Sequence, residues 1–335
     1  MLIMSPERQM EHLQKVSRTF ALTIPLLPPQ LTDWVGNAYL LCRIADTIED
    51  DAVMNNEDKA CELEAFVSYL SAPLKIEEWA NSIYEKLKDT AKPTEADLIA
   101  EIPQVLGRYY SYTPEVRKIL RHGVVIMCKG MSQFDRWLHI DSLDEVDHYC
   151  YSVAGVVGEI LAALFAEYSA TIKPSLPQMM PLAVSFGEGL QLTNILKDVW
   201  DDSERGIRWL PLNPDWDEAQ RAKFTREYAQ TAYGHVMQGL DFISMIPRKE
   251  KGIRDFCLLA NIMAAMTLNN IYINPSFTKA TDIKISRKEV KKVFLLIKLF
   301  SSSNWWMKWY VKRCASSMKP LLRNATDLRT KVSFW

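Results

Sequence analysis

The hydrophobic pattern of this chain is helical over almost its whole length. Apolar residues recur every three or four positions in long stretches, a spacing that places them on one face of an α-helix. Glycine and proline are scarce, at 12 and 16 of 335 residues, so the stretches are rarely interrupted. The ranges predicted to be helical are 31–54, 57–71, 75–91, 95–110, 114–137, 142–168, 176–203, 215–246, 250–273 and 286–312.

Proline-containing segments mark the connections between these helices. They read PLLPP at 25–29, TIKPSLP at 171–177 and RGIRWLPLNPDW at 205–216. No repeat, low-complexity tract or linker suggests a domain boundary. With 48% hydrophobic residues the chain can bury a large core, so we expect one all-α domain over residues 1–335.

Several functional classes lack their sequence signals. No glycine-rich phosphate loop of the GxGxxG or GxxxxGK type is present. The six cysteines form no CxxC pair, and such scattered thiols suit a reducing compartment. The five histidines show no metal-binding spacing. The N-terminus has no apolar signal core, and no window of about 18 uncharged apolar residues occurs. We therefore expect a cytoplasmic protein, either free or peripheral on the cytoplasmic membrane face.

The net charge of −1 conceals a strong asymmetry. Residues 284–335 form a basic, aromatic C-terminal segment with thirteen Lys or Arg and two acids, a net charge of +11, which leaves −12 for the rest of the chain. Within it, FLLIKLFSSSNWWMKWYVKR at 294–313 combines tryptophans with lysines. Two interpretations stay open: contact with an anionic membrane surface, or packing as a final core helix. We expect no nucleic-acid partner, and the pattern does not determine the oligomeric state.

Two helical stretches end in acidic residues. The first, AYLLCRIADTIEDD at 38–51, places Asp46 and Asp50 four residues apart with Glu49 beside them. Helical spacing gives it a polar face of Tyr39, Arg43, Asp46 and Asp50. The opposite face is Leu40, Leu41, Ile44 and Ile48.

The second stretch, LQLTNILKDVWDD at 190–202, repeats the arrangement. Its polar face is Gln191, Asn194, Asp198 and Asp202, and its apolar face is Leu192, Ile195, Leu196 and Val199. A single acidic helix end is usually a solvated surface, because like charges at this spacing destabilise a helix by only about 0.2–0.5 kcal/mol per pair. The repetition favours a functional site instead.

Facing helices of this kind would form a carboxylate-lined mouth that attracts cations. Oxygen ligands select Mg²⁺ or Mn²⁺, and Mg²⁺ is typically bound by a few carboxylates together with substrate phosphates. Nearby bases would meet the remaining phosphate charge. These bases are Arg18, Arg43, Lys197, Arg205 and Arg208. Apolar helices below could hold a long hydrocarbon, so the pattern favours ionisation of an allylic diphosphate.

Four motifs resemble the squalene and phytoene synthase family, the head-to-head prenyl synthases. They are SRTFALTIP at 17–25, DTIEDD at 46–51, YCYSVAGVVGE at 149–159 and QLTNILKDVWDD at 191–202. Their order and spacing extend the resemblance over nearly the whole chain. The squalene synthase branch is the most similar, through KGMSQF at 129–134, FCLLANIMAAMTLNNIY at 256–272 and KISRK at 284–288.

The resemblance implies an isoprenoid-synthase helical bundle around a central hydrophobic cavity, with both acidic motifs at its rim. The implied metal ligands are Asp46, Glu49, Asp50, Asn194, Asp198 and Asp202. The implied substrate-binding residues are Ser17, Arg18, Phe20, Tyr39, Arg43, Gln191, Lys197, Arg205 and Arg208. Tyr149 matches a tyrosine that handles protons during cyclopropane formation, although spacing alone favours a core aromatic. The Gly155 and Gly158 pair would give room to substrate or allow close helix packing.

The implied reaction joins two molecules of farnesyl diphosphate through presqualene diphosphate, followed by reduction with NADPH to squalene. Lys284, Arg287 and Lys288 match a basic segment near the NADPH phosphate, although KISRKE departs from the family's KxRKG-like pattern. Without hydride the product would be dehydrosqualene or phytoene. The sequence does not distinguish C15 from C20 substrates.

Two other classes of protein are alternatives to a head-to-head prenyl synthase. The DDxxD motif of chain-elongating isoprenoid synthases is absent from residues 46–51. A non-catalytic relative acting as an assembly protein would have no need of acids in both motifs.

Overall fold

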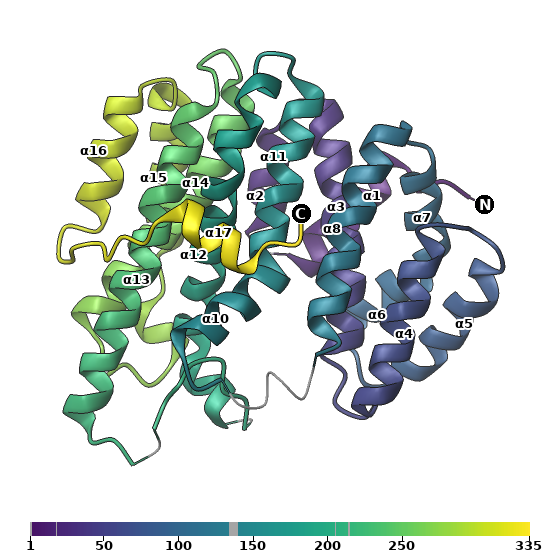
Figure 1. Ribbon diagram of the computed structural model, residues 1–335, viewed down its shortest axis with the longest axis horizontal. Coiled ribbons are helices and arrows are strands. Elements are labelled where there is room, and N and C mark those ends of the chain that lie inside the picture. Colours follow the sequence, from purple (N-terminus) through teal and green to yellow (C-terminus); the bar gives the residue numbers. More distant parts are fainter. Residues whose placement is uncertain (1, 18, 134–139, 205, 214) are drawn as a thin grey trace. The chain divides into compact units, whose positions relative to one another are not determined.

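The computed structural model describes residues 2–17, 19–133, 140–204, 206–213 and 215–335. Within these ranges every regular element is a helix, which confirms the all-α prediction (Figure 1). The packing divides the chain into two compact units. The first comprises residues 1–134, 163–169 and 335, and the second comprises 135–162 and 170–334. A single domain with a central cavity stays a prediction.

The first unit is organised around the long helix α3. Its helices are α1 (Pro6–Val16), α2 (Phe20–Thr23), α3 (Pro29–Glu49), α4 (Asn56–Tyr69), α5 (Ile76–Leu87), α6 (Pro93–Ala100), α7 (Ile102–Tyr110) and α8 (Pro114–Met131). Helix α3 packs against α1, α4, α7 and α8. The four residues of its predicted apolar face, from Leu40 to Ile48, are fully buried. This packing fixes the acidic end of α3.

The second unit contains the longest helix of the described chain, α12. Its helices are α10 (Leu143–Cys150), α11 (Val156–Tyr168, shared with the first unit), α12 (Leu176–Glu204), α13 (Glu218–Met245), α14 (Lys251–Ile273), α15 (Arg287–Phe300), α16 (Asn304–Cys314) and α17 (Ala325–Val332). Helix α12 packs on α13, α13 on α14, and α14 on α15 and α16 (Figure 1). The predicted apolar face of α12, from Leu192 to Val199, is buried.

Three predicted helices are each divided in two. The 95–110 stretch divides at Glu101, because Pro103 in the next turn cannot continue the hydrogen bonding of α6. The 142–168 stretch contains a π-helical turn over Tyr151–Gly155. The 286–312 stretch divides where Ser303 caps α16. Helices α1, α2 and α17 were not predicted.

For Gly158, the structure supports the interpretation that glycine allows close helix packing, and Gly187 of α12 makes a similar contact. A Cβ atom at Gly158 would overlap the carbonyl oxygen of Ala183, and one at Gly187 would overlap the carbonyl oxygen of Ala154. Helix α12 therefore contacts the segment of Ala154 to Gly158 through backbone atoms. Only glycine permits this distance.

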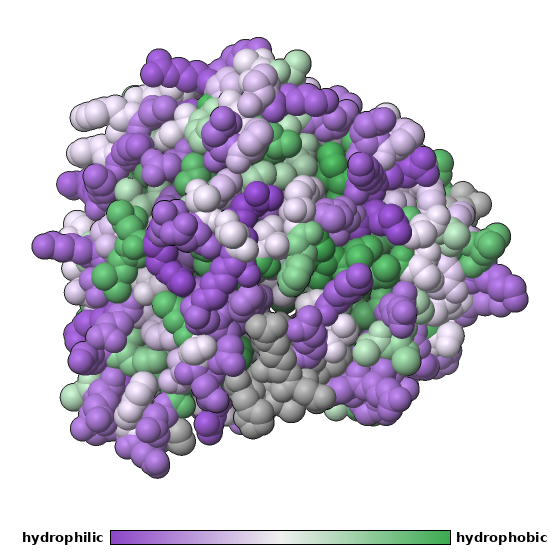
Figure 2. All heavy atoms as spheres, in the orientation of Figure 1, coloured by the Kyte–Doolittle hydropathy of each residue, from purple (hydrophilic) through white to green (hydrophobic). Residues whose placement is uncertain are grey.

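Residues 319–334 pack within the second unit as a strap along its other helices (Figure 1). The amide of Leu321 donates to the carbonyl of Gln230 at 3.0 Å, and Gly234 leaves room for the Leu321 carbonyl. Arg329 of α17 pairs with buried Glu159 at 2.7 Å. Figure 2 shows mostly hydrophilic side chains on this face around α17.

Two segments, Leu143–Tyr168 and Lys251–Ile273, are long and apolar enough to cross a membrane. Their most apolar windows are 83% and 61% buried within the protein. Buried core helices pass the same test of length and hydropathy.

Candidate active site

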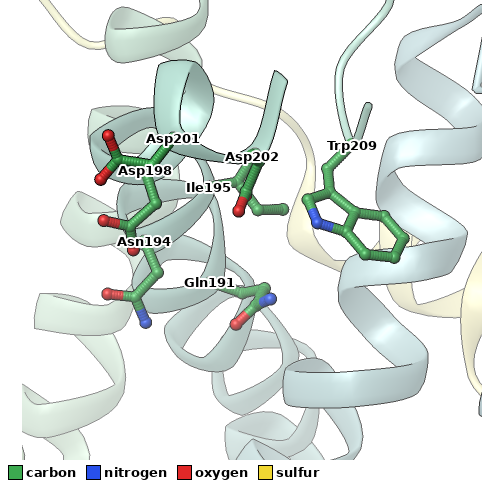
Figure 3. A pocket seen from close by; sticks show the side chains of 7 residues that line it. All are labelled: Gln191, Asn194, Ile195, Asp198, Asp201, Asp202 and Trp209. Atoms are coloured by element: carbon green, nitrogen blue, oxygen red, sulfur yellow. The ribbon is translucent and has the colours of Figure 1, made fainter. Parts of the chain in front are cut away.

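The second acidic motif lines an open cavity of about 280 Å³ at the end of α12. Its lining residues are Gln191, Asn194, Ile195, Asp198, Asp201, Asp202 and Trp209. Figure 3 shows Asn194, Asp198 and Asp201 along one side of the helix, with Gln191 and Asp202 on the side of Trp209. The predicted polar face of α12 is therefore the cavity wall.

A turn after α12 brings Trp209 back to this cavity. The amide of Ile207 donates to the carbonyl of Asp202 at 2.9 Å, and Gly206 has φ of 77°. A positive φ is easily adopted by glycine and rarely by other residues. The local sequence thus returns the chain and places an indole ring opposite the carboxylates.

The bases predicted beside this motif differ in their placement. Lys197 pairs with Asp198 at 3.1 Å, and both side chains are about one third exposed. Arg208 is exposed. Arg205 lies outside the described residues. The Lys197 pair contributes little to stability at this exposure, so its ammonium group is available to an anionic ligand.

Tyr149 reaches the cavity through an aromatic stack. It is buried in α10, with 5% exposure, and its ring lies 4.2 Å from that of Trp209 at an interplanar angle of 10°. Since Trp209 lines the cavity, Tyr149 lies one ring behind its wall. This placement is compatible with a core aromatic and with a proton-handling residue.

The first acidic motif is a crowded cluster of carboxylates at the end of α3. Desolvation raises the pKa of Asp46 to about 6 against the opposing effect of Arg43, and Asp50 and Glu95 add repulsion. Desolvation, with the charges of Asp46 and Asp50, raises the pKa of Glu49 well above its usual value. The pKa of Asp50 is raised as well, again mainly by desolvation. The cluster thus has more negative charge than its protein neighbours neutralise.

This imbalance fits a divalent cation. The donors are carboxylate oxygens, with an amide oxygen from Asn194 in the second motif, and hard cations such as Mg²⁺ prefer such oxygens. Arg43 lies 3.6 Å from Asp46 and supplies a single positive charge to the first motif. The predicted ligands Asp46, Glu49 and Asp50 lie together, and so do Asn194, Asp198 and Asp202.

Four of the predicted substrate-binding residues, Ser17, Phe20, Tyr39 and Arg43, form a set of contacts that leads to Asp46. The amide of Phe20 donates to Ser17 Oγ at 3.0 Å, and the rings of Phe20 and Tyr39 lie 5.4 Å apart. Arg43 donates to the Tyr39 hydroxyl at 3.0 Å. The first motif and the SRTF segment are therefore neighbours in the first unit. Arg18 lies outside the described residues.

The basic segment predicted to lie near the NADPH phosphate spans the start of α15 and the residues just before it. Lys284, Arg287 and Lys288 are all exposed. The short helix Ala280–Ile283 just before them packs on α12. In addition, Phe277 contacts the ring of Trp200 at 6.5 Å. The segment is thereby anchored to the same end of α12 as the second acidic motif.

Three cavity residues, Ile195, Asp201 and Trp209, were not predicted as site residues; Ile195 was assigned to the apolar face of α12. Asp201 lies three residues after Asp198, so helical spacing could have found it. Trp209 lies in a loop without periodicity, and only the turn at Gly206 hints that the chain returns. Tertiary packing determines that contact.

Comparison with known proteins identifies the family of this chain. Residues 13–289 match the sequence profile of the squalene/phytoene synthase family. The Botryococcus squalene synthase of Botryococcus braunii is 29% identical over 301 residues, covering 85% of this chain and 62% of the relative. Squalene synthase ERG9 of Candida albicans is 29% identical over 288 residues, covering 79% and 61%. The chain thus spans about three fifths of the length of these curated relatives.

Solved structures share the fold. TcSQS in complex with the ligand BPH1237 superimposes with a TM-score of 0.77 at 21% identity, covering 98% of this chain and 96% of the other. A dehydrosqualene synthase in complex with a ligand gives a TM-score of 0.58 at 17% identity, covering 88% and 95%. The fold and the paired acidic motifs define an all-helical protein of the isoprenoid-synthase type. More particularly, the chain belongs to the squalene/phytoene synthase family.

Proposed function

We propose that this chain is a squalene synthase, a prenyltransferase that joins two molecules of farnesyl diphosphate head to head. Presqualene diphosphate would be the intermediate, and NADPH would reduce it to squalene. The observation that carries the proposal is the pair of acidic motifs, one a charge-rich cluster in the first unit and the other the wall of a cavity in the second. Family membership supplies the reaction class.

The acidic residues would hold Mg²⁺, with Mn²⁺ as a substitute. Asp46, Glu49 and Asp50 would do so in the first unit, and Asn194, Asp198 and Asp202 in the second. When bound, the ion supplies positive charge that stabilises a leaving diphosphate. Arg43 in the first unit and Lys197 in the second would each add charge-assisted hydrogen bonds to phosphate oxygens.

The neighbouring aromatic side chains would serve the carbocationic part of the reaction. The Tyr39 hydroxyl accepts a hydrogen bond from Arg43 and its ring lies against Phe20, so these rings would shield a bound substrate from water. Tyr149 would accept or return a proton, with its ring held by Trp209. Trp209 would also present an electron-rich face to cationic carbon.

NADPH use is supported by the position of the basic segment. Lys284, Arg287 and Lys288 follow a short helix that packs on α12, the helix carrying the second acidic motif. Three exposed cations at a helix N-terminus suit a phosphate group. The alternatives are a dehydrosqualene or phytoene synthase without reduction, and a non-catalytic family member acting in assembly.

The decisive experiment is incubation of purified protein with farnesyl diphosphate and Mg²⁺, with and without NADPH, followed by identification of the hydrocarbon. We expect squalene with NADPH, and presqualene diphosphate or an unreduced hydrocarbon without it. Geranylgeranyl diphosphate in a parallel reaction tests the C20 substrate. An identical product with and without nucleotide assigns the non-reductive reaction, and no product from either substrate favours the assembly role.

We also propose that α15 and α16 bind an anionic membrane surface reversibly. Their inner faces pack in the protein through Val293, Ile297, Met307 and Val311. Their outer face exposes Leu295, Leu299, Phe300, Trp305 and Trp309. An open hollow of about 490 Å³ beside it is lined by Trp309, Lys312, Arg313 and Ser316. The inner faces of α15 and α16 therefore support the interpretation of core packing, and the outer face supports the interpretation of membrane contact.

Vesicle sedimentation tests the membrane proposal. Wild-type protein should bind phosphatidylserine-containing vesicles at low salt, where electrostatic attraction is strongest. The double variant Trp305→Ser, Trp309→Ser should bind at least about tenfold more weakly, since it loses interfacial aromatics. Leu74→Ser, at a position 77% exposed in the first unit, is the matched control. Absence of binding by the wild type at low salt contradicts the proposal.

A further inference from the structure

Three ionisable side chains lie buried together in the second unit, apart from the acidic motifs. They are Asp147 of α10, Glu188 of α12 and His235 of α13, and each is at most 1% exposed. One potential ligand atom from each lies within 4.8 Å of the other two. His235 Nδ1 and Glu188 Oε2 are 3.8 Å apart.

The inner atoms of this cluster have no partner. Asp147 Oδ1, both carboxylate oxygens of Glu188 and both ring nitrogens of His235 make no hydrogen bond to any described residue. Burying a polar atom in this way costs about 1–3 kcal/mol, and folded proteins rarely leave such atoms unsatisfied. Five such atoms converging on one place indicate a ligand that the polypeptide itself does not supply.

The atoms surrounding the cluster are satisfied, in contrast. Arg323 of the strap donates to Asp147 Oδ2, and the Arg323 carbonyl accepts from Gln238. The Gln238 side-chain oxygen in turn accepts from Ser185 at 2.7 Å. Outer partners that orient inner ligands are typical of metal sites in proteins.

We propose that Asp147, Glu188 and His235 bind a divalent transition-metal ion of the zinc class. Two carboxylate oxygens and one imidazole nitrogen are ordinary ligands of Zn²⁺, whereas Mg²⁺ prefers oxygen alone. The ion's charge balances the two carboxylates.

The proposed metal site lies close in sequence to Tyr149 and to the second acidic motif. Asp147 precedes Tyr149 by two residues, and Glu188 precedes Gln191 by three. A bound ion therefore fixes α10 relative to α12, and with them Tyr149 relative to the cavity. The inference is independent of the proposed reaction, because it concerns a buried site that needs no substrate.

Metal titration of the purified chain of residues 1–335, stripped with a chelator, tests the site. Zn²⁺ should raise the unfolding temperature, and Co²⁺ should bind stoichiometrically with the visible absorption of a low-symmetry nitrogen and oxygen site. His235→Gln should lower Zn²⁺ affinity by more than about 100-fold, beyond the loss usual for an outer partner. Asp198→Asn, which alters only the second acidic motif, is the control and should retain the Zn²⁺ response.

The competing explanation is a cluster neutralised by protons and buried water. Glu188→Gln separates the two, because glutamine mimics the protonated carboxyl and preserves the fold in that case. Under our proposal this variant loses the Zn²⁺-induced stabilisation and the Co²⁺ spectrum. A stripped wild-type protein that shows neither a Zn²⁺ shift nor a Co²⁺ spectrum overturns the metal site, whatever the fate of the variants. Product formation from farnesyl diphosphate and Mg²⁺ is a separate readout, so the two proposals can fail independently.

Discussion

At the scale of single residues, carboxylates are held where they repel one another. Asp46, Glu49 and Asp50 all have raised pKa values, chiefly through desolvation. Such an arrangement destabilises a protein when the groups ionise, because charge is gathered without compensation. Its retention at the end of α3 is explained if a cation completes the cluster.

The cluster predicts a pH-dependent effect of Mg²⁺ on stability. The pKa of Asp46 is about 6 in the folded protein, above its value in the unfolded chain, so the folded state favours the protonated carboxyl. The stability that Asp46 contributes in this protonated form is present at low pH and is lost as the pH rises through about 6. Mg²⁺ opposes that loss. We expect Mg²⁺ to raise the unfolding temperature at about pH 7.5 and much less at about pH 5. Equal shifts at both pH values, or an undiminished shift in Asp46→Asn, would count against a metal site here.

Tyr149 gives a second prediction at this scale. Tyr149→Phe keeps the stack on Trp209 but removes the hydroxyl, so turnover should fall by about 100-fold or more while the unfolding temperature is nearly unchanged. Quantifying presqualene diphosphate and measuring thermal unfolding check both parts. Wild-type formation of the intermediate would show that Tyr149 acts only in packing.

Residues placed by helical spacing could be predicted, and residues placed by tertiary packing could not. The faces containing Asp46 and Asp198 follow from the geometry of a single helix. Trp209 depends on a loop, and the meeting of Glu188 with His235 depends on the packing of α12 on α13. No local pattern contains that information.

At the scale of elements, the hydrophobic period identified most helices but did not reveal every interruption. The period continues through the π-helical turn at Tyr151–Gly155, because one extra residue in a turn changes the register only locally. Helix α17 is short and is held by contacts of its charged residues, such as Arg329 with Glu159. Its apolar pattern is therefore too weak to predict.

The close contact between Gly158 of α11 and helix α12 leads to a prediction about the packing of these two helices. Gly158→Ala adds a methyl group against the Ala183 carbonyl, so the helices must separate, and overpacking of this kind costs about 1–3 kcal/mol. Thermal unfolding should show a decrease of several degrees. Val157→Ala, on the neighbouring half-buried position, should change the unfolding temperature less. A stabilised Gly158→Ala variant would contradict the packing described for this pair.

At the scale of the whole molecule, the strap closes the second unit. In residues 319–334, the amide of Leu321 bonds Gln230 of α13, Arg329 pairs with Glu159, and Arg323 pairs with buried Asp147. Removing the strap leaves buried Glu159 and Asp147 without their cations, and breaking a buried pair typically costs about 3–5 kcal/mol.

A chain ending at residue 318 should therefore unfold at a markedly lower temperature than the chain of residues 1–335. The double variant Trp305→Ser, Trp309→Ser is the comparison, because it changes exposed residues of α16, outside the strap, and should keep its stability. An unaltered unfolding temperature in the truncated chain would mean that the strap is only loosely attached.

The central claim is that both acidic motifs serve one metal-dependent reaction of a prenyl diphosphate. Its most direct test is the Mg²⁺-dependent release of diphosphate from farnesyl diphosphate by the wild type, Asp46→Asn and Asp198→Asn. Asp89→Asn and Asp327→Asn, at exposed positions, are the controls. We predict that each motif variant folds normally and loses activity by about 100-fold or more, whereas the controls keep theirs. Activity near that of the wild type in both motif variants at limiting Mg²⁺ would contradict the account.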